Sequence, residues 1–330
     1  MRILVAGATG AIGRRLLPLL VQAGHTVFGM TRSPHKWAMV SALGAEPIIA
    51  DALNTADVMN AIRRTRPAVI IHELTAIPQS LDVRRFAEQF ASTNQLRVEG
   101  TDNLLAGARA AGARRFVAQS FAGWTFASSG GSIQSEQGQL DSDPPAALRS
   151  VLGALRYLES AVTGASGLEG LALRYGAFYG PGTSVAPEGA MTAMVRRRLL
   201  PIVGRGSGVW SWLHIDDAAR ATLAAVERGQ AGVYNIVDDE PAAVAEWLPA
   251  LADAAGAKSP RRVPDWLGRL AVGKHGVVLM NEVRGASNRK AKCELDWHPL
   301  WPSWRRGFQD VLRGMECDSS APGETHRKIA

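Results

Sequence analysis

The sequence predicts an α/β fold, a doubly wound parallel sheet with helices on both of its faces. Short apolar runs alternate with helical patterns through the first half of the chain. The apolar runs are continuous, which is typical of strands that are buried on both sides. The expected strands are residues 3–6, 26–30, 46–50, 68–72, 115–119, 170–174 and 233–237, and the expected helices include 11–23, 56–65, 86–111 and 146–163.

The first turn of the chain indicates what kind of ligand this fold binds. An apolar run from Ile3 leads into three glycines spaced three apart, Gly7, Gly10 and Gly13, and a helix pattern follows at once. Such a turn lets the backbone approach a pyrophosphate, and the free N–H groups of the helix bind the anion. The strand–turn–helix order predicts a dinucleotide-binding Rossmann domain. The expected contacts are Gly7, Thr9, Gly10, Ala11, Ile12 and Gly13.

A smaller, mostly helical lobe is expected beside this domain. The segment 176–208 begins rich in glycine and proline and interrupts the sheet pattern, and the region beyond Pro241 is mostly helical. We therefore expect residues 1–175 plus 209–240 to form the dinucleotide-binding domain. Residues 176–208 plus 241–315 would form a substrate-binding lobe, and 316–330 a disordered tail.

Composition excludes several classes of protein. The 330 residues include 37 Lys and Arg against 30 Asp and Glu, which gives a net positive charge. Because these basic residues are scattered along the sequence, nucleic-acid binding is not expected. The apolar runs are too short to span a membrane, and no secretory leader precedes the first strand. Cys293 and Cys317 make no disulfide framework, and no Cys/His cluster predicts a metal site. A cytoplasmic protein is expected.

The end of the second strand indicates which nicotinamide cofactor is bound. NAD usually requires a carboxylate there, but the sequence has Arg32, with Ser33 and Lys36 close behind it. A guanidinium pairs with a 2′-phosphate, so NADP is preferred over NAD. Asp51, which ends the third strand ahead of Ala52 and Leu53, either binds the adenine amino group or caps the next helix.

Landmarks along residues 2–310 resemble the extended short-chain dehydrogenase/reductase family, in its NAD-dependent epimerase/dehydratase group. They are the segments 7–13, 70–72, 99–105, 114–120, 173–182, 212–217 and 233–236. The resemblance implies a nucleotide cleft on the sheet and a lobe that contacts the substrate. It implies that Leu74, Thr75 and Ala76 line the nicotinamide ribose, that Asn94 belongs to the cofactor site, and that a homodimer forms through the helices 86–111 and 146–163.

The family's acid/base couple, a Tyr followed four residues later by a Lys, does not match this chain. With Glu159 aligned to the acidic residue that follows the couple, Val151 stands at the Tyr position and Leu155 at the Lys position. Tyr157 lies about 200° around the helix from Leu155, so we expect it to pack or to face solvent. General acid–base help is worth about 10²–10⁴ in rate, so a replacement is needed.

Replacements are expected from loops at the carboxyl edge of the sheet. The catalytic candidates are Ser120, Tyr175, Tyr179 and Glu73. The family's catalytic hydroxyl falls one position after Ser120, at Phe121. Ser120 therefore either binds a ligand or only forms the end of its strand. The candidate substrate contacts are Gln119, Trp210, Trp212 and His214. Arg97, one helical turn after Asn94, reaches either an anionic group or the solvent.

These features predict an NADP(H)-binding oxidoreductase or epimerase-like enzyme that acts on a small apolar metabolite with a non-standard acid or base. Two alternatives stay open. The same scaffold serves a non-redox isomerase, dehydratase or cyclase, and it also serves an NADP-binding regulator without catalysis.

Overall fold

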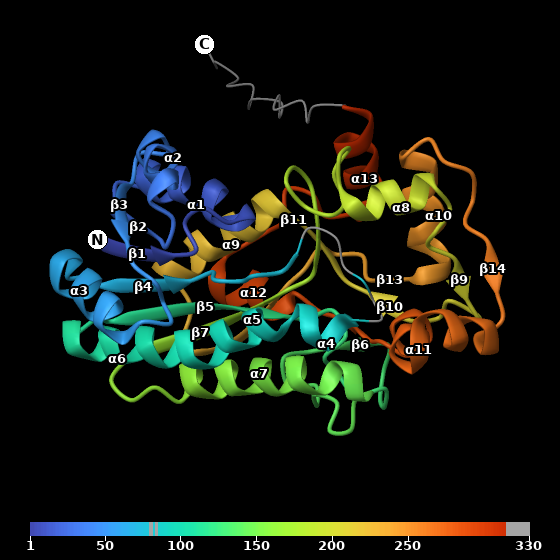
Figure 1. The fold of residues 1–330 in the computed structure, drawn as a ribbon, viewed down its shortest axis with the longest axis horizontal. Coiled ribbons are helices and arrows are strands. Elements are labelled where there is room, and N and C mark those ends of the chain that lie inside the picture. Colours follow the sequence, from blue (N-terminus) through green and yellow to red (C-terminus); the bar gives the residue numbers. More distant parts are fainter. Residues whose placement is uncertain (79–81, 83–84, 315–330) are drawn as a thin grey trace, which may run out of the picture.

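A seven-stranded parallel sheet forms the centre of the molecule (Figure 1). The computed structural model describes residues 1–78, 82 and 85–314, so the expected tail at 316–330 lies outside the described residues. The strand order is β12-β7-β5-β4-β1-β2-β3. Their bounds are β1 Arg2–Ala6, β2 Thr26–Thr31, β3 Glu46–Ile49, β4 Val69–His72, β5 Arg115–Phe121, β7 Glu169–Tyr175 and β12 Gly232–Ile236. All seven strands expected from the sequence are confirmed, each within two residues of its predicted bounds.

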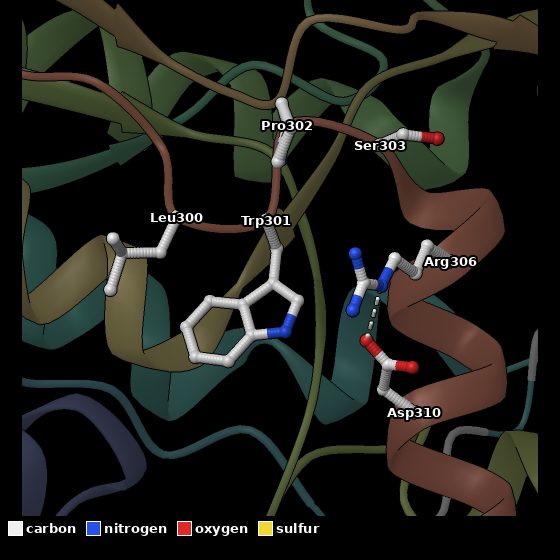
Figure 2. Close-up of a pocket in the computed structure, with 6 residues that line it drawn as sticks. All are labelled: Leu300, Trp301, Pro302, Ser303, Arg306 and Asp310. Carbon is white, nitrogen blue, oxygen red and sulfur yellow. Dashed lines mark ion pairs between the residues drawn. The ribbon is translucent and has the colours of Figure 1, made fainter. Parts of the chain in front are cut away.

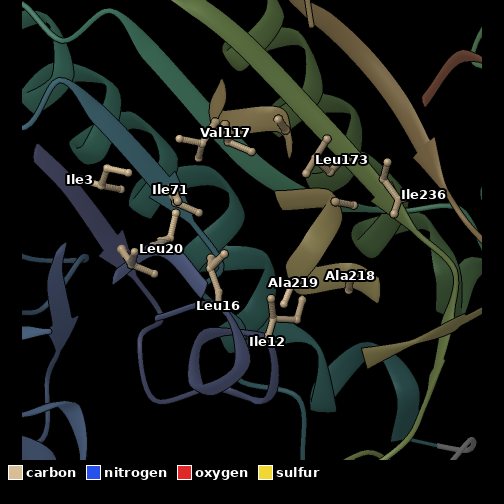
Figure 3. Packing of buried hydrophobic residues seen from close by; sticks show 14 of the residues in the cluster. Ile3, Ile12, Leu16, Leu20, Ile71, Val117, Leu173, Ala218, Ala219 and Ile236 are labelled. Carbon is tan, nitrogen blue, oxygen red and sulfur yellow. The ribbon is translucent and has the colours of Figure 1, made fainter. Parts of the chain in front are cut away.

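Helices cover both faces of this sheet, as predicted. On one face α1 (Ala11–Gln22) packs against α9 (Ile215–Glu227), and their apolar side chains meet Ile3, Ile71 and Val117 of the sheet (Figure 3). On the other face lie α3 (Thr55–Thr65), α6 (Thr101–Ala111) and α7 (Ala146–Thr163). Because side chains alternate along a strand, neighbouring residues of each strand enter these two different cores.

The predicted helical stretch over 86–111 is confirmed, but it is not a single uniform α-helix. The segment is divided into α4 (Phe86–Gln89), α5 (Ala91–Gln95), a π-helical turn labelled η3 (Leu96–Gly100) and α6. Between Phe90 and Leu104 the buried positions are Thr93, Arg97, Gly100 and Thr101, so the apolar pattern is interrupted around the π turn. Single π turns inside helices are frequent at functional sites.

The order of the strands locates the binding edge of the sheet. The chain runs from β1 outward to β2 and β3, then returns to place β4 on the other side of β1. In parallel sheets the loops after two such strands separate and leave a crevice at their carboxyl ends. The glycine turn after β1 and the loop after β4 therefore meet at this crevice.

The smaller lobe is mostly helical, as expected (Figure 1). Its helices are α8 (Ala190–Arg196), α10 (Val244–Ala254), α11 (Asp265–Asn281) and α13 (Trp304–Arg313). Short strands join them in two pairs, β10 (Val209–Trp210) with β13 (Ala242–Ala243) and β9 (Ile202–Val203) with β14 (Arg262–Val263). Trp212, Trp247, Trp304 and Phe308 fill its core. The exact domain boundaries stay a prediction.

The remaining elements are short. They are the 3₁₀ turn η1 (Pro34–Lys36), α2 (Trp37–Ala42), β6 (Ile133–Gln134), β8 (Ala177–Tyr179), β11 (Trp212–His214), β15 (Gly285–Ala286) and α12 (Arg289–Leu295). β8 pairs with β11 and β6 with β15, both in parallel.

Candidate dinucleotide site

The glycine turn has the geometry that a close approach to a phosphate requires. Gly7 has φ +98°, and a Cβ there would lie 2.5 Å from the carbonyl oxygen of Glu73. A Cβ on Gly13 would lie 2.3 Å from the carbonyl oxygen of Gly7. The N–H of Gly10 donates to that same carbonyl at 2.9 Å. Only glycine fits at Gly7 and Gly13, because both positions are crowded by backbone atoms.

The start of α1 is free to bind an anion. Its N-cap, Gly10, provides no side-chain hydrogen bond, and the first turn carries no acidic residue. The first N–H groups of such a helix lack intrahelical partners, and the helix dipole favours negative charge beside them. The guanidinium Nε of Arg14 donates to the carbonyl of Gly10 at 3.4 Å and adds positive charge nearby. This turn fits the pyrophosphate of a dinucleotide.

The residues expected near the adenosine follow β2 and β3. Arg32 is exposed one residue after β2 ends, with no carboxylate between Thr31 and Lys36. Asp51 accepts a hydrogen bond from the N–H of Leu53 at 3.0 Å. The N-cap of α3 is Asn54, whose side chain accepts from two N–H groups of the first turn. The alternative in which Asp51 caps that helix is therefore wrong, and its contact with adenine stays a prediction.

The loop after β4 lies across the glycine turn. The N–H of Leu74 donates to Nδ1 of His72 at 3.2 Å, and the N–H of Ala76 donates to Oγ1 of Thr93 at 3.0 Å. Burial lowers the pKa of His72 to about 4, so its imidazole is neutral. Thr75 projects outward as an exposed residue between these two anchors. The loop is held in place by its backbone, which leaves the side chain of Thr75 available to a ligand.

Two of the catalytic candidates, Glu73 and Tyr175, bind each other on the α1/α9 face. Tyr175 donates from Oη to Oε1 of Glu73 at 2.9 Å, and its Oη also lies 2.6 Å from Oγ1 of Thr222. Both side chains are buried, and Oε2 of Glu73 has no hydrogen-bond partner. Burial raises the pKa of Glu73 to about 8, although the Tyr175 bond opposes this. Burial and the charge of Glu73 raise the pKa of Tyr175.

Ser120 lies on the opposite face, in a buried ionic cluster. Its hydroxyl donates to Oε1 of Glu159 at 2.6 Å. Arg174 donates to both oxygens of the same carboxylate, each at 2.7 Å. Glu159 and Arg174 were not predicted to act together, although a charged residue inside the apolar run of β7 was a signal for such a pair. The hydroxyl of Ser120 is thus held by α7 within the core.

The positions aligned with the family's acid/base couple are apolar and buried. Val151 and Leu155 on α7 are each 1% exposed and join a cluster with Phe86, Phe90 and Leu148. Phe121 and Trp124 pack against this cluster from the end of β5. Tyr157 is 41% exposed, and its hydroxyl donates to Asp102 at 2.7 Å, so the expected solvent-facing placement is confirmed. The cluster presents hydrocarbon where relatives would have a phenol and an ammonium.

The candidates from the lobe lie mostly in its core. Tyr179 is buried between His214 and Phe308, and its hydroxyl has no hydrogen-bond partner. Trp212 is fully buried, whereas Trp210 is half-buried and donates from Nε1 to the carbonyl of Leu279 at 2.9 Å. These positions separate Tyr179 from Glu73 and Tyr175, so the four catalytic candidates do not form one constellation.

His214 has a structural role. Its Nδ1 accepts from the N–H of Asp216 at the start of α9, and its ring stacks on Trp301 with centroids 3.7 Å apart. Burial lowers its pKa to about 3, and the charge of Arg15 lowers it further. Gln119 is half-buried near the end of β5. The substrate contacts assigned to His214, Gln119 and the two tryptophans stay predictions.

A pocket of about 130 Å³ lies beside Trp301, between the segment 300–303 and α13 (Figure 2). Arg306 and Asp310 of α13 form an ion pair at its wall, with 3.4 Å between the paired atoms. Pockets that bind small molecules usually measure about 300–1,000 Å³, so this one is too small for a dinucleotide.

Among the described residues, no three His, Cys, Asp or Glu side chains are placed to hold a metal ion. No helix in the described ranges is both long and apolar enough to cross a membrane.

The parallel sheet, the glycine turn and the uncapped helix define a dinucleotide-binding α/β protein. The model of the NAD dependent epimerase/dehydratase family matches residues 3–237, and the chain belongs to this family. The family resemblance expected from the sequence is confirmed. Proteins of this family depend on nicotinamide cofactors. Membership of the family does not distinguish NAD from NADP.

Two curated relatives are reductases. The chain is 41% identical over 313 residues to a 3-diazoavenalumate denitrifying reductase of a Streptomyces species, covering 93% of this chain and 99% of the relative. It is 30% identical over 272 residues to the 2-alkyl-3-oxoalkanoate reductase of Stenotrophomonas maltophilia, covering 78% and 76%. The dTDP-glucose 4,6-dehydratase of Streptomyces venezuelae, solved with NAD, shares the fold with a TM-score of 0.73 at 23% identity over 95% of this chain and 96% of that one.

Proposed function

We propose that this protein is a nicotinamide-dependent reductase that removes nitrogen from an apolar, carboxylate-bearing diazo compound. The observation that carries the proposal is the apolar cluster at the position of the couple, in which Val151 and Leu155 are buried while Phe121 and Trp124 are half-buried at its edge. The relative that is 41% identical is named for a reduction that loses nitrogen from a diazo acid. The aromatic side chains of Phe86, Phe90 and Phe121 around the two aliphatic ones favour an apolar substrate.

The chemistry explains why the usual couple is dispensable. Reduction of a ketone needs a proton at the oxygen as well as a hydride at the carbon, and the Tyr–Lys couple supplies that proton. A bound reduced nicotinamide supplies the hydride. When hydride replaces a diazonium group, one C–H bond forms and one C–N bond breaks, and the electron pair of the broken bond leaves with N₂. For the diazonium ion, which is the proposed reacting form, atoms and electrons balance without a proton from the protein.

We also propose that NADP is the preferred cofactor. Arg32 is exposed directly after β2, at the position where an NAD-binding protein has a carboxylate. An Arg32→Ala variant should lose most of its preference for NADPH over NADH when both are titrated by fluorescence. An unchanged preference in that variant would show that Arg32 does not contact the 2′-phosphate.

The reaction is tested with 4-carboxybenzenediazonium and NADPH deuterated at the transferable position of C4. The expected product is benzoate carrying deuterium at the carbon that held nitrogen, formed faster than in a mixture without protein. Hydrolysis to 4-hydroxybenzoate, or loss of nitrogen without deuterium transfer, would contradict the proposal. Turnover of a ketone panel in place of the diazo compound would favour an ordinary ketone reductase. Tight NADPH binding with no turnover at all would favour the non-redox or regulatory alternatives.

A further inference from the structure

Arg97 is a buried cation for which the described part of the protein provides no anion. Its side chain is 5% exposed, and Nη1 has no hydrogen-bond partner. Burial lowers its pKa to about 10, and no carboxylate in the described ranges opposes that effect. Buried charges in proteins are normally paired, because the loss of hydration is otherwise uncompensated. The expectation that Arg97 reaches solvent is therefore wrong, and the described residues leave its charge open to an anionic ligand.

The position of Arg97 places this charge beside the cofactor loop. It belongs to the π turn η3, and the carbonyl of Leu96 in that turn contacts Nε2 of His72 at 3.3 Å. The charge of Arg97 also lowers the pKa of His72, the last residue of β4. Two residues further along, Leu74 begins the loop that the family resemblance assigns to the nicotinamide ribose. The guanidinium is thus close to the end of β4 where this loop starts.

The other neighbour of η3 is the apolar cluster. The turn packs against α7, the helix that carries Val151 and Leu155. Asn94, three residues before Arg97 and on the same side of the helical path, has a buried Oδ1 without a hydrogen-bond partner. Because Oδ1 of Asn94 is an acceptor, Arg97 alone offers positive charge between the cofactor loop and the apolar cluster. A ligand with one anionic end and one apolar body matches this arrangement.

We propose that Arg97 forms the subsite that binds the carboxylate of the substrate. The identity of that substrate as a diazo acid rests on the proposed function, but the subsite itself does not. A guanidinium binds a carboxylate through two parallel N–H···O bonds. The apolar body of the substrate then lies along the cluster on α7.

The binding test uses the protein loaded with NADP⁺ and two unreactive probes, cinnamate and cinnamamide, followed by calorimetry. Wild-type protein should bind cinnamate more tightly than cinnamamide. Arg97→Met should weaken cinnamate binding by about 10- to 100-fold, the range expected for a lost hydrogen bond to a charged group, and should leave cinnamamide unchanged. Arg97→Lys should restore part of the preference. Arg109→Met, an exposed residue of α6, is the matched control and should behave as wild type.

A stability measurement separates this role from a structural one. Because Arg97 lacks a partner in the unliganded protein, Arg97→Met should have a melting temperature equal to or above that of the wild type. A lower melting temperature together with an unchanged preference for cinnamate would overturn the proposal. So would a wild-type protein that does not distinguish the two probes. Weaker NADP⁺ binding with unchanged probe binding would assign the guanidinium to a cofactor phosphate and refute the substrate assignment.

The two proposals fail separately. If diazo reduction is absent but the cinnamate preference depends on Arg97, the subsite stands and the proposed function falls. If deuterium is transferred to the diazo carbon while Arg97→Met keeps the full cinnamate preference, the proposed function stands and the subsite falls.

Discussion

Replacing Glu73 by glutamine should change how the stability of the fold depends on pH. The carboxyl group is buried against α9, with one oxygen bonded to Tyr175 and the other without a partner. Burial raises its pKa from 4.5 to about 8. Between these two values the folded protein holds a proton that the unfolded chain has already released. The free energy of unfolding of the wild type must therefore fall as the pH rises through this window.

The magnitude follows from the two pKa values. Each pH unit across the window is worth about 1.4 kcal/mol, so the interval from 4.5 to about 8 corresponds to about 5 kcal/mol. Protonation also suits the local hydrogen bonds. A protonated Glu73 can donate to Tyr175, which then donates to Thr222, whose hydroxyl donates to the carbonyl of Ala218 at 2.8 Å. Ionised Glu73 instead requires a donor at Oε1 and leaves Oε2 unsatisfied.

The assay is urea denaturation at several pH values from 4.5 to 9, at constant ionic strength. Glu73→Gln, which is neutral throughout, should have about the wild-type stability at pH 4.5 and should exceed it by up to about 5 kcal/mol above pH 8. Glu188→Gln, at an exposed position, is the control and should follow the wild-type curve. Parallel curves for wild type and Glu73→Gln across this range would refute the inference that Glu73 is protonated in the fold.

Three further outcomes are expected. Gly13→Ala should abolish NADPH binding in a fluorescence titration, because the added Cβ would collide with the carbonyl of Gly7. Gly153→Ala is the control, since a Cβ added there meets no atom within 4 Å. This variant should bind NADPH normally and gain about 0.5–1 kcal/mol in helix stability. Arg174→Met should lower the free energy of unfolding by about 3–5 kcal/mol by leaving Glu159 unpaired, and the double variant with Glu159→Met should recover most of the loss in urea. Light scattering should give a dimer of twice the 35.2 kDa chain mass, and a monomer would contradict the predicted helix-mediated contact.

The fold was predictable because its signals are local. Continuous apolar runs identify buried parallel strands, and the strand–glycine–helix order identifies the phosphate turn, so all seven strands were found. The π turn at residues 96–100 was not found, because polar residues at the buried positions Thr93, Arg97 and Thr101 do not reveal which kind of helical turn the backbone forms there. Its consequence is large, since the turn determines where Arg97 points.

The roles of the polar residues were less predictable, because they depend on which face of the sheet each residue enters. Glu73 and Tyr175 come from strands that are separated in sequence by about 100 residues, and only the sheet order brings them together. Thr222, which completes their contact, carries no sequence signal inside its helix. Ser120 enters the opposite core, where Glu159 holds it. Residues that all follow parallel strands therefore share one edge of the sheet but not one site.

The apolar side chains of α7 and the buried Arg97 both suit a substrate that carries a cation at one end and a carboxylate at the other. A diazonium group is a cation, and two unit charges 4 Å apart repel by about 4 kcal/mol at an effective dielectric constant of about 20. A lysine at position 155 would add such a repulsion, whereas leucine does not. Arg97 would repel the diazonium end as well, but it attracts a carboxylate at the other end of the molecule. In the proposed complex, the charge that binds the acid would therefore orient the diazonium away from Arg97 and toward the apolar cluster that contains Leu155.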